Sequence, residues 1–99
     1  MAFGIVLEFA SVTKQQYDSA NEQLGIDMAS ATGDWPDGLQ SHAGGTTSTG
    51  FCVFEVWESK AQQQVFLSGR LGAALGAVGV PVPTRVIEID VVGYATPNT

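Results

Sequence analysis

Alternation between large apolar residues and other residues marks the first segment of the chain. In Phe3–Phe9 (FGIVLEF) every second residue is large and apolar, which is the pattern of a strand with one buried face. Phe51–Trp57 (FCVFEVW) and Arg85–Val92 (RVIEIDVV) are rich in β-branched and aromatic residues and also predict strands. A further strand is expected over Leu39–Gly44, and the turn formers of Gly45–Gly50 (GTTSTG) would join it to the next strand as a hairpin.

Two helices are predicted, each beginning at a capping box. Thr13 and Gln16 can satisfy free amide groups at a helix start, and the residues that follow predict a helix running toward Ser30. Its apolar stripe, for which core packing is the expected role, is Tyr17, Ala20, Leu24 and Met28, and its polar face carries Asp18, Asn21 and Glu22. Ser59 and Gln62 repeat the box before a second apolar helix, which glycines and prolines end beyond residue 78.

The expected order of elements is therefore β-α-β-β-α-β. Thr32–Gly38 (TGDWPDG), dense in turn formers, connects the first helix to the second strand. This order predicts an α+β, ferredoxin-like fold with an antiparallel sheet. No linker or repeat divides the chain, so residues 1–99 are expected to form one domain.

Alternation sorts the strand residues into two faces. One face is wholly apolar and is expected to lie under the helices: Phe3, Ile5, Leu7, Phe9, Cys52, Phe54, Val56, Ile87, Ile89 and Val91. The other is mixed: Val6, Glu8, Gln40, His42, Phe51, Val53, Glu55, Trp57, Val86, Glu88, Asp90 and Val92. Because the mixed face is too apolar to be left open to water, we expect it to meet a second copy of the chain, with a pocket between them.

Composition narrows the classes of partner. Hydrophobic residues make up 44% of the 99 residues and charged residues only 14%, which favours burial of some surface between subunits. The net charge of -6 disfavours binding to nucleic acid, and no apolar run is long enough to predict a membrane span. A lone Cys52, with no basic leader segment, fits the cytoplasm, and no Cys/His spacing indicates a metal site.

His42, the only histidine, is the leading candidate for chemistry. An imidazole among apolar and carboxylate groups is suited to general acid or base catalysis, because its ordinary pKa of roughly 6.5 lies near neutral pH. A structural hydrogen bond near the hairpin and simple exposure are the alternatives. For Glu55 the alternatives are proton transfer and a solvated or paired role, and for Trp35 and Trp57 they are ligand contact and packing. Cys52 is expected to be a buried, unreactive thiol.

Two motifs carry a resemblance. The Trp35-Pro36-Asp37-Gly38-Leu39-x-x-His42 entry to the second strand and the Val56-Trp57-Glu58-Ser59 junction resemble the dimeric α/β-barrel superfamily, in particular antibiotic biosynthesis monooxygenase-type proteins. The resemblance implies a homodimer in which two sheets form a barrel and each subunit holds a pocket. Haem-degrading members use a histidine and a tryptophan on the second helix and an asparagine on the first strand, a set that this chain lacks.

The resemblance implies a small-molecule enzyme that works without a cofactor. The expected function is a monooxygenase, cyclase or isomerase acting on an aromatic or polyketide-like substrate, with His42 and Glu55 as the catalytic residues. The expected substrate-binding residues are Trp35 as a lid, with Phe51, Trp57, Val53 and Val6. The alternatives are a non-catalytic ligand-binding or stress-associated barrel protein, and an interaction module that docks a larger enzyme.

Overall fold

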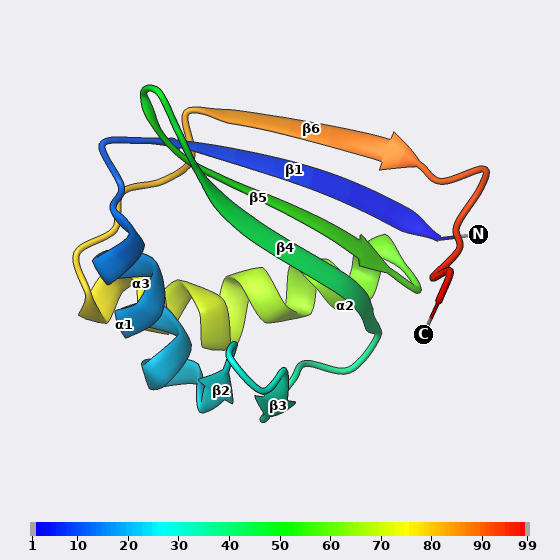
Figure 1. Ribbon diagram of the computed structural model, residues 1–99, viewed down its shortest axis with the longest axis horizontal. Helices are drawn as coiled ribbons and strands as arrows, with labels where there is room; N and C mark the ends of the chain where they lie inside the picture. Colours follow the sequence, from blue (N-terminus) through cyan, green and yellow to red (C-terminus); the bar gives the residue numbers. More distant parts are fainter. Residues whose placement is uncertain (1, 99) are drawn as a thin grey trace.

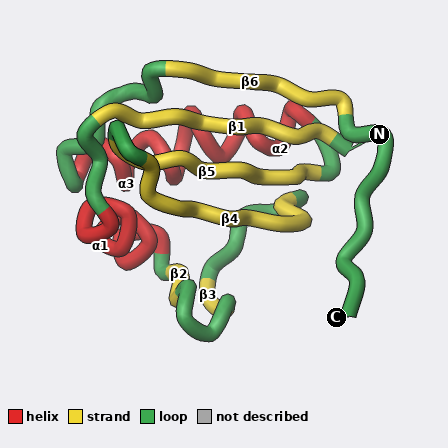
Figure 2. Tube along the Cα trace, turned by 45° about the horizontal axis from the view of Figure 1, so that its top comes forward, coloured by secondary structure: helices red, strands yellow, loops and turns green. Residues whose placement is uncertain are grey.

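The computed structural model describes residues 2–98 and confirms the predicted order of elements, with one small hairpin added (Figure 1). The strands and helices are β1 (Phe3–Ala10), α1 (Lys14–Leu24), β2 (Ile26–Asp27), β3 (Thr32–Gly33), β4 (Leu39–Thr47), β5 (Gly50–Trp57), α2 (Lys60–Phe66), a π-helical turn (Leu67–Leu71), α3 (Gly72–Ala77) and β6 (Arg85–Asp90). The four long strands form one sheet in the order β4-β5-β1-β6, with every neighbouring pair antiparallel (Figure 2). This is the predicted α+β, ferredoxin-like arrangement.

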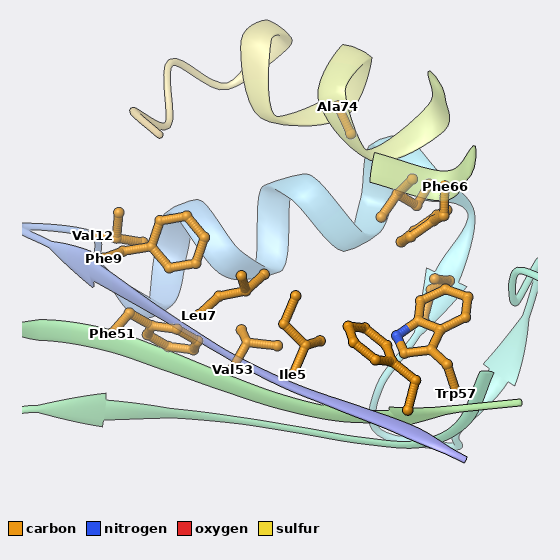
Figure 3. Packing of buried hydrophobic residues seen from close by; sticks show 12 residues of the cluster. Ile5, Leu7, Phe9, Val12, Phe51, Val53, Trp57, Phe66 and Ala74 are labelled. Atoms are coloured by element: carbon orange, nitrogen blue, oxygen red, sulfur yellow. The ribbon is translucent and has the colours of Figure 1, made fainter. Parts of the chain in front are cut away.

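All the helices lie on one face of the sheet (Figure 1). The core between the two layers is built from the same face of β1 and β5 together with residues of the helices (Figure 3). Its strand residues are Phe3, Ile5, Leu7, Phe9, Phe51, Val53 and Trp57, and Leu24, Phe66 and Ala74 join them from the helices. Burial of each large side chain stabilises the fold by roughly 1.5–3 kcal/mol, so this single interface accounts for much of the stability.

The first helix is shorter than its hydrophobic stripe predicted. The Thr13 capping box is present, with hydrogen bonds in both directions between Thr13 and Gln16. The helix ends at Leu24 rather than running toward Ser30, because Gly25 adopts a left-handed conformation (φ 74°) and its N–H caps the last carbonyls. The chain then forms the β2–β3 hairpin instead of two further helical turns.

The second helical segment continues without a break in its right-handed backbone. Ser59 caps it by accepting a hydrogen bond from the Gln62 N–H. Midway, the π-helical turn inserts one extra residue per hydrogen-bonded ring, and such turns are frequent at functional sites. The final strand ends at Asp90, two residues before its predicted end at Val92.

The hairpin turn lies further along the chain than predicted. β4 continues through Gly44 and Gly45 to Thr47, and the turn consists of Ser48 and Thr49. The glycines of the predicted turn are therefore strand residues. At Gly44 the ring of Tyr17 lies so close to the strand that it leaves no room for a side chain.

The predicted assignment of faces was right for β1 and wrong for β5, for β6 and for His42 of β4. Leu7 pairs with Val53 and with Val86, and paired residues of antiparallel strands point to the same side. Phe51, Val53, Glu55 and Trp57 therefore lie under the helices, and Cys52, Phe54, Val56, Ile87 and Ile89 lie on the opposite face. Both faces of β5 are apolar, so alternation alone does not orient it, and the burial of Glu55 is tolerated because the carboxylate is hydrogen-bonded.

The face of the sheet without helices is mostly apolar and partly exposed, and Glu8 and Arg85 form an ion pair at one end of it. We call it the outer face and define it by Val6, Ala43, Cys52, Phe54, Ile87 and Ile89. Phe54 is 43% exposed and Ile89 is 37% exposed in the single chain. Cys52 is partly exposed here, which corrects the prediction that it faces the helices. Within residues 2–98, no helix is long and apolar enough to cross a membrane.

Candidate functional site

A cavity of about 70 Å³ lies between the sheet and the helices. Most of its wall is apolar, including Leu7, Phe9, Leu24, Phe51, Val53, Phe66, Leu71 and Leu75. Five polar side chains also line it: Gln16, Tyr17 and Asn21 from α1, and His42 and Glu55 from the sheet. A mostly apolar cavity with a few converging polar groups is typical of a small-molecule site.

The polar groups of the sheet form a chain of hydrogen bonds with Tyr17. The Tyr17 hydroxyl lies 2.5 Å from Nε2 of His42, and Nδ1 of His42 lies 2.7 Å from Oε2 of Glu55. The other carboxylate oxygen, Oε1, accepts a hydrogen bond of 3.1 Å from the indole N–H of Trp57. The side chains of His42 and Glu55 are only 10% and 6% exposed, so the chain of hydrogen bonds is shielded from water. We call Tyr17, His42 and Glu55 the relay.

The positions of the relay residues follow from strand register and helix packing. His42 and Glu55 are directly opposed in the β4–β5 ladder, which brings their side chains together on the helix side. Tyr17 reaches them from α1, with its ring stacked on the His42 imidazole and tilted against Phe51. This approach requires Gly44, because a Cβ at that position would lie 2.8 Å from Cζ of Tyr17.

The hydrogen-bond partners assign the tautomer of His42. A carboxylate only accepts hydrogen bonds, so Nδ1 carries the hydrogen that Glu55 receives. Nε2 is then the acceptor for the Tyr17 hydroxyl. The relay can therefore pass a proton from Tyr17 to His42, and Glu55 would stabilise the imidazolium that forms.

The electrostatic surroundings keep Tyr17 neutral. Burial raises the pKa of Tyr17 above its ordinary value of 10.0, and the charges of Glu55 and Asp18 raise it further against an opposing effect of Asn21. A neutral Tyr17 can donate its hydroxyl hydrogen to His42, and its hydroxyl oxygen can at the same time accept a hydrogen bond from another group. It is therefore suited to hand a proton on rather than to act as a permanent base.

The predicted site residues fall into three groups. The cavity is lined by Trp35, Phe51 and Val53 and by both predicted catalytic residues, His42 and Glu55. The ring centroid of Trp35 lies 6.0 Å from that of His42. Trp57 is fully buried behind Glu55 and holds the carboxylate in place. Val6 lies on the outer face, away from the cavity, because it alternates with the core residues of β1. Of the predicted substrate-binding residues, Trp57 and Val6 do not line the cavity, so the expected substrate contact at these two positions is wrong.

Comparison with solved structures identifies the fold. A crystal structure from Chloroflexus aurantiacus J-10-fl, named as an antibiotic biosynthesis monooxygenase, matches over 97% of this chain and 98% of that chain, with a TM-score of 0.66 and 18% identity. The fold is ferredoxin-like. No protein-family model matches the chain, and no curated protein matches it at a significant level.

Two further structures extend the ferredoxin-like likeness. A monooxygenase from the gene ActVA-Orf6 of Streptomyces coelicolor, in complex with the ligand Nanaomycin D, matches over 98% of this chain and 92% of that one (TM-score 0.55, 17% identity). A dimeric ferredoxin-like protein from Thermobifida fusca matches over 89% of this chain and 86% of that one (TM-score 0.50, 18% identity). The structural neighbours are thus ferredoxin-like proteins, among them dimers and proteins named as antibiotic biosynthesis monooxygenases.

Two residues of this ferredoxin-like chain were not predicted as site residues. Tyr17 was assigned to core packing, and Asn21 to the polar face of the helix. Asn21 is instead 8% exposed and lines the cavity. Its spacing of four residues from Tyr17 was the signal in the sequence, because residues i and i+4 share one side of a helix. Among residues 2–98, no group of three or more His, Cys, Asp or Glu side chains could hold a metal ion.

Proposed function

We propose that the protein is an enzyme that activates a small phenol or enol by removing its proton, using His42 as the base. The observation that carries the proposal is the relay, a shielded chain of hydrogen bonds that ends at an apolar cavity. General bases of this kind contribute typically 10²–10⁴-fold to a rate. Glu55 serves to orient His42 and to balance its positive charge.

The proton follows the hydrogen bonds of the relay. The hydroxyl of a bound phenol donates to the oxygen of Tyr17, while the hydrogen of Tyr17 moves to Nε2 of His42. The products are a bound phenolate, a neutral Tyr17 and an imidazolium hydrogen-bonded to Glu55. The positive charge forms next to a buried carboxylate, where the weak screening strengthens their attraction.

Oxygenation is the proposed use of the resulting anion. A phenolate or enolate delocalises its charge onto ring carbon, and that carbanion can react with O₂. Conversion of an activated ring CH₂ to C=O by O₂ releases one water, so this reaction balances without an external reductant. The likeness of the fold to antibiotic biosynthesis monooxygenases supports this reaction over cyclisation or isomerisation.

The size of the cavity favours a substrate with one ring. A volume of about 70 Å³ is well below the roughly 300 Å³ of sites for drug-sized ligands. A fused polycyclic substrate would require Trp35 or Tyr17 to move, since these two rings flank His42. A monocyclic phenol is therefore the substrate class to test first.

A homodimer is proposed on the basis of the outer face. Its apolar residues are partly exposed in the single chain, and covering them removes apolar surface from water. The fold is shared with proteins that are dimeric, which supports a dimer of this chain. The cavity lies on the other side of the sheet, so each subunit would hold its own.

Binding of 4-nitrophenol tests the proposal, because its phenolate is coloured and its neutral form is not. We expect the wild-type protein, at a pH where the free probe is neutral, to generate the colour of the phenolate. The His42→Gln variant should lose it, and the control Ala43→Ser, at the next residue and on the outer face, should keep it. Binding without colour would contradict the proposal and favour a non-catalytic ligand-binding protein. Oxygen consumption with monocyclic phenols then tests the oxygenation.

A further inference from the structure

The amide of Asn21 is the one polar group at the cavity that the relay does not use and the fold does not satisfy. Its side chain is more than nine-tenths buried, and within residues 2–98 its Nδ2 is the buried side-chain atom that has no hydrogen-bond partner. A buried polar group without a partner costs about 1–3 kcal/mol, so such groups are rare in folded proteins. Replacement by leucine, a residue of similar size, would avoid this cost.

The surroundings of Asn21 indicate a ligand as the missing partner. Asn21 lines the cavity and also the surface groove between α1 and β4. The groove and the cavity share Tyr17 and Phe51 as well, so Asn21 stands where the two spaces meet. An N–H donor at this point is available to a molecule that enters the cavity from the groove.

Asn21 also lies next to the start of the proton path. It follows Tyr17 by one helical turn on the same side of α1, and the amide is close enough to Tyr17 to oppose the rise in the pKa of its hydroxyl. The geometry of a hydrogen bond between the two side chains is nevertheless not met. One ligand oxygen can therefore reach both groups.

We propose that the Nδ2–H of Asn21 donates a hydrogen bond to the same substrate oxygen that loses its proton to Tyr17. This inference rests on the proposed function and assigns Asn21 the role of oxyanion stabiliser. The bond is weak while the oxygen belongs to a neutral hydroxyl and strengthens as the phenolate forms, since hydrogen bonds to charged groups are about twice as strong. Stabilisation that grows along the reaction accelerates it, whereas uniform binding does not.

The role requires a substrate oxygen with a free lone pair beside the ionising O–H. A phenol or an enol meets this requirement, whereas an amine of the same shape would place a positively charged or hydrogen-bearing group against the amide N–H. The structure thus favours oxygen acids over nitrogen bases as substrates. Three acidic residues line the groove, Asp18, Glu22 and Asp27, so an anion held there needs a hydrogen-bond donor such as the Asn21 amide.

The test compares Asn21→Leu with a matched control, Gln23→Leu, which removes an exposed amide from the same helix. For each variant, the affinity for 4-nitrophenol is measured below and above the pH at which the free probe ionises. We expect Asn21→Leu to lower the affinity for the phenolate about tenfold, with a much smaller effect on neutral phenol. We also expect its Tm to rise by a few degrees, because the unpaired amide is gone.

Each outcome bears on a separate claim. Equal loss of affinity for both forms of the probe, or a fall in Tm, would show that Asn21 is structural and would overturn the inference alone. Unchanged affinities would overturn it as well. Failure of the wild-type protein to bind the probe would overturn the proposed function and this inference together.

If Asn21→Leu does not fold, the same hydrogen bond can be tested on the wild-type protein. The side-chain amide protons of Asn21 can be followed by NMR as 4-nitrophenol is added. A downfield shift that follows the phenolate fraction supports the hydrogen bond. Amide signals that do not move as the phenolate binds would contradict it.

Discussion

Substitution of Gly44 by alanine tests how strictly the relay depends on close packing. Gly44 has an ordinary backbone conformation, so alanine introduces no strain of the kind found at left-handed glycines. Its Cβ would nevertheless meet the Tyr17 ring at 2.8 Å from Cζ and at 2.9 Å from the hydroxyl oxygen. Gly45→Ala is the matched control, because nothing lies within 4 Å of a Cβ at that position.

The size of the effect follows from these distances. Ordinary contact begins near 3.4 Å, so the Tyr17 ring must withdraw by about 0.6 Å. Withdrawal directly away from β4 would lengthen the 2.5 Å separation between the hydroxyl and Nε2 of His42 to about 3.1 Å, at the long end of the usual range. The expected costs are about 1–3 kcal/mol for overpacking and up to about 1 kcal/mol for the weakened hydrogen bond.

Two assays report these costs. Urea unfolding should show Gly44→Ala to be less stable by about 1–3 kcal/mol, with Gly45→Ala close to wild type. The imidazole signals of His42, the only histidine, should shift in Gly44→Ala alone. Identical stability and identical His42 signals in the two variants would refute the claim that Tyr17 is seated on Gly44.

Three other perturbations have defined outcomes. Glu55→Gln keeps an acceptor for the indole N–H of Trp57 but removes the charge that balances the imidazolium of His42. The phenolate colour of bound 4-nitrophenol should therefore fall about tenfold or more. Unchanged colour would contradict the role of Glu55. Folding raises the pKa of Tyr17 above 10.0, so the unfolded state loses this proton first as the pH rises. The free energy of unfolding of the wild type should therefore fall above pH 10.0 more steeply than that of Tyr17→Phe. Parallel plots of unfolding free energy against pH, measured with urea, would contradict this. Phe54→Asp puts a charge on the outer face and should yield monomers in analytical ultracentrifugation. The control Val65→Asp changes an apolar residue of α2 that is 73% exposed, and it should remain dimeric. Identical sedimentation profiles of the two variants would count against the outer face as the interface.

Periodicity and capping residues were sufficient to predict the fold. The alternation of β1, the Thr13 capping box and the strand character of β5 each specify local structure, and short connections leave few ways to assemble them. Local signals also placed His42 in a strand. The end of α1 was missed because the apolar spacing continues beyond Gly25, whose left-handed conformation stops the helix.

The orientation of β5 could not be predicted, because both of its faces are apolar. The deciding feature is the hydrogen bonding of Glu55 to His42 and Trp57, which makes burial of a carboxylate tolerable and depends on contacts between strands. His42 and Glu55 were predicted as a catalytic pair and do lie together, but on the helix side of the sheet. Tyr17 and Asn21 were missed because an apolar stripe and an amide on a helix are usually packing and surface features.

The most direct test of the relay is an NMR measurement of the two imidazole nitrogens of His42, made with and without bound 4-nitrophenol. In the free protein, the account predicts hydrogen on Nδ1 and an unprotonated Nε2 that accepts from Tyr17. On binding, it predicts that Nε2 gains a proton in proportion to the phenolate formed. A phenol that binds in the cavity while the His42 nitrogens remain unchanged would contradict the proposal that His42 is the base.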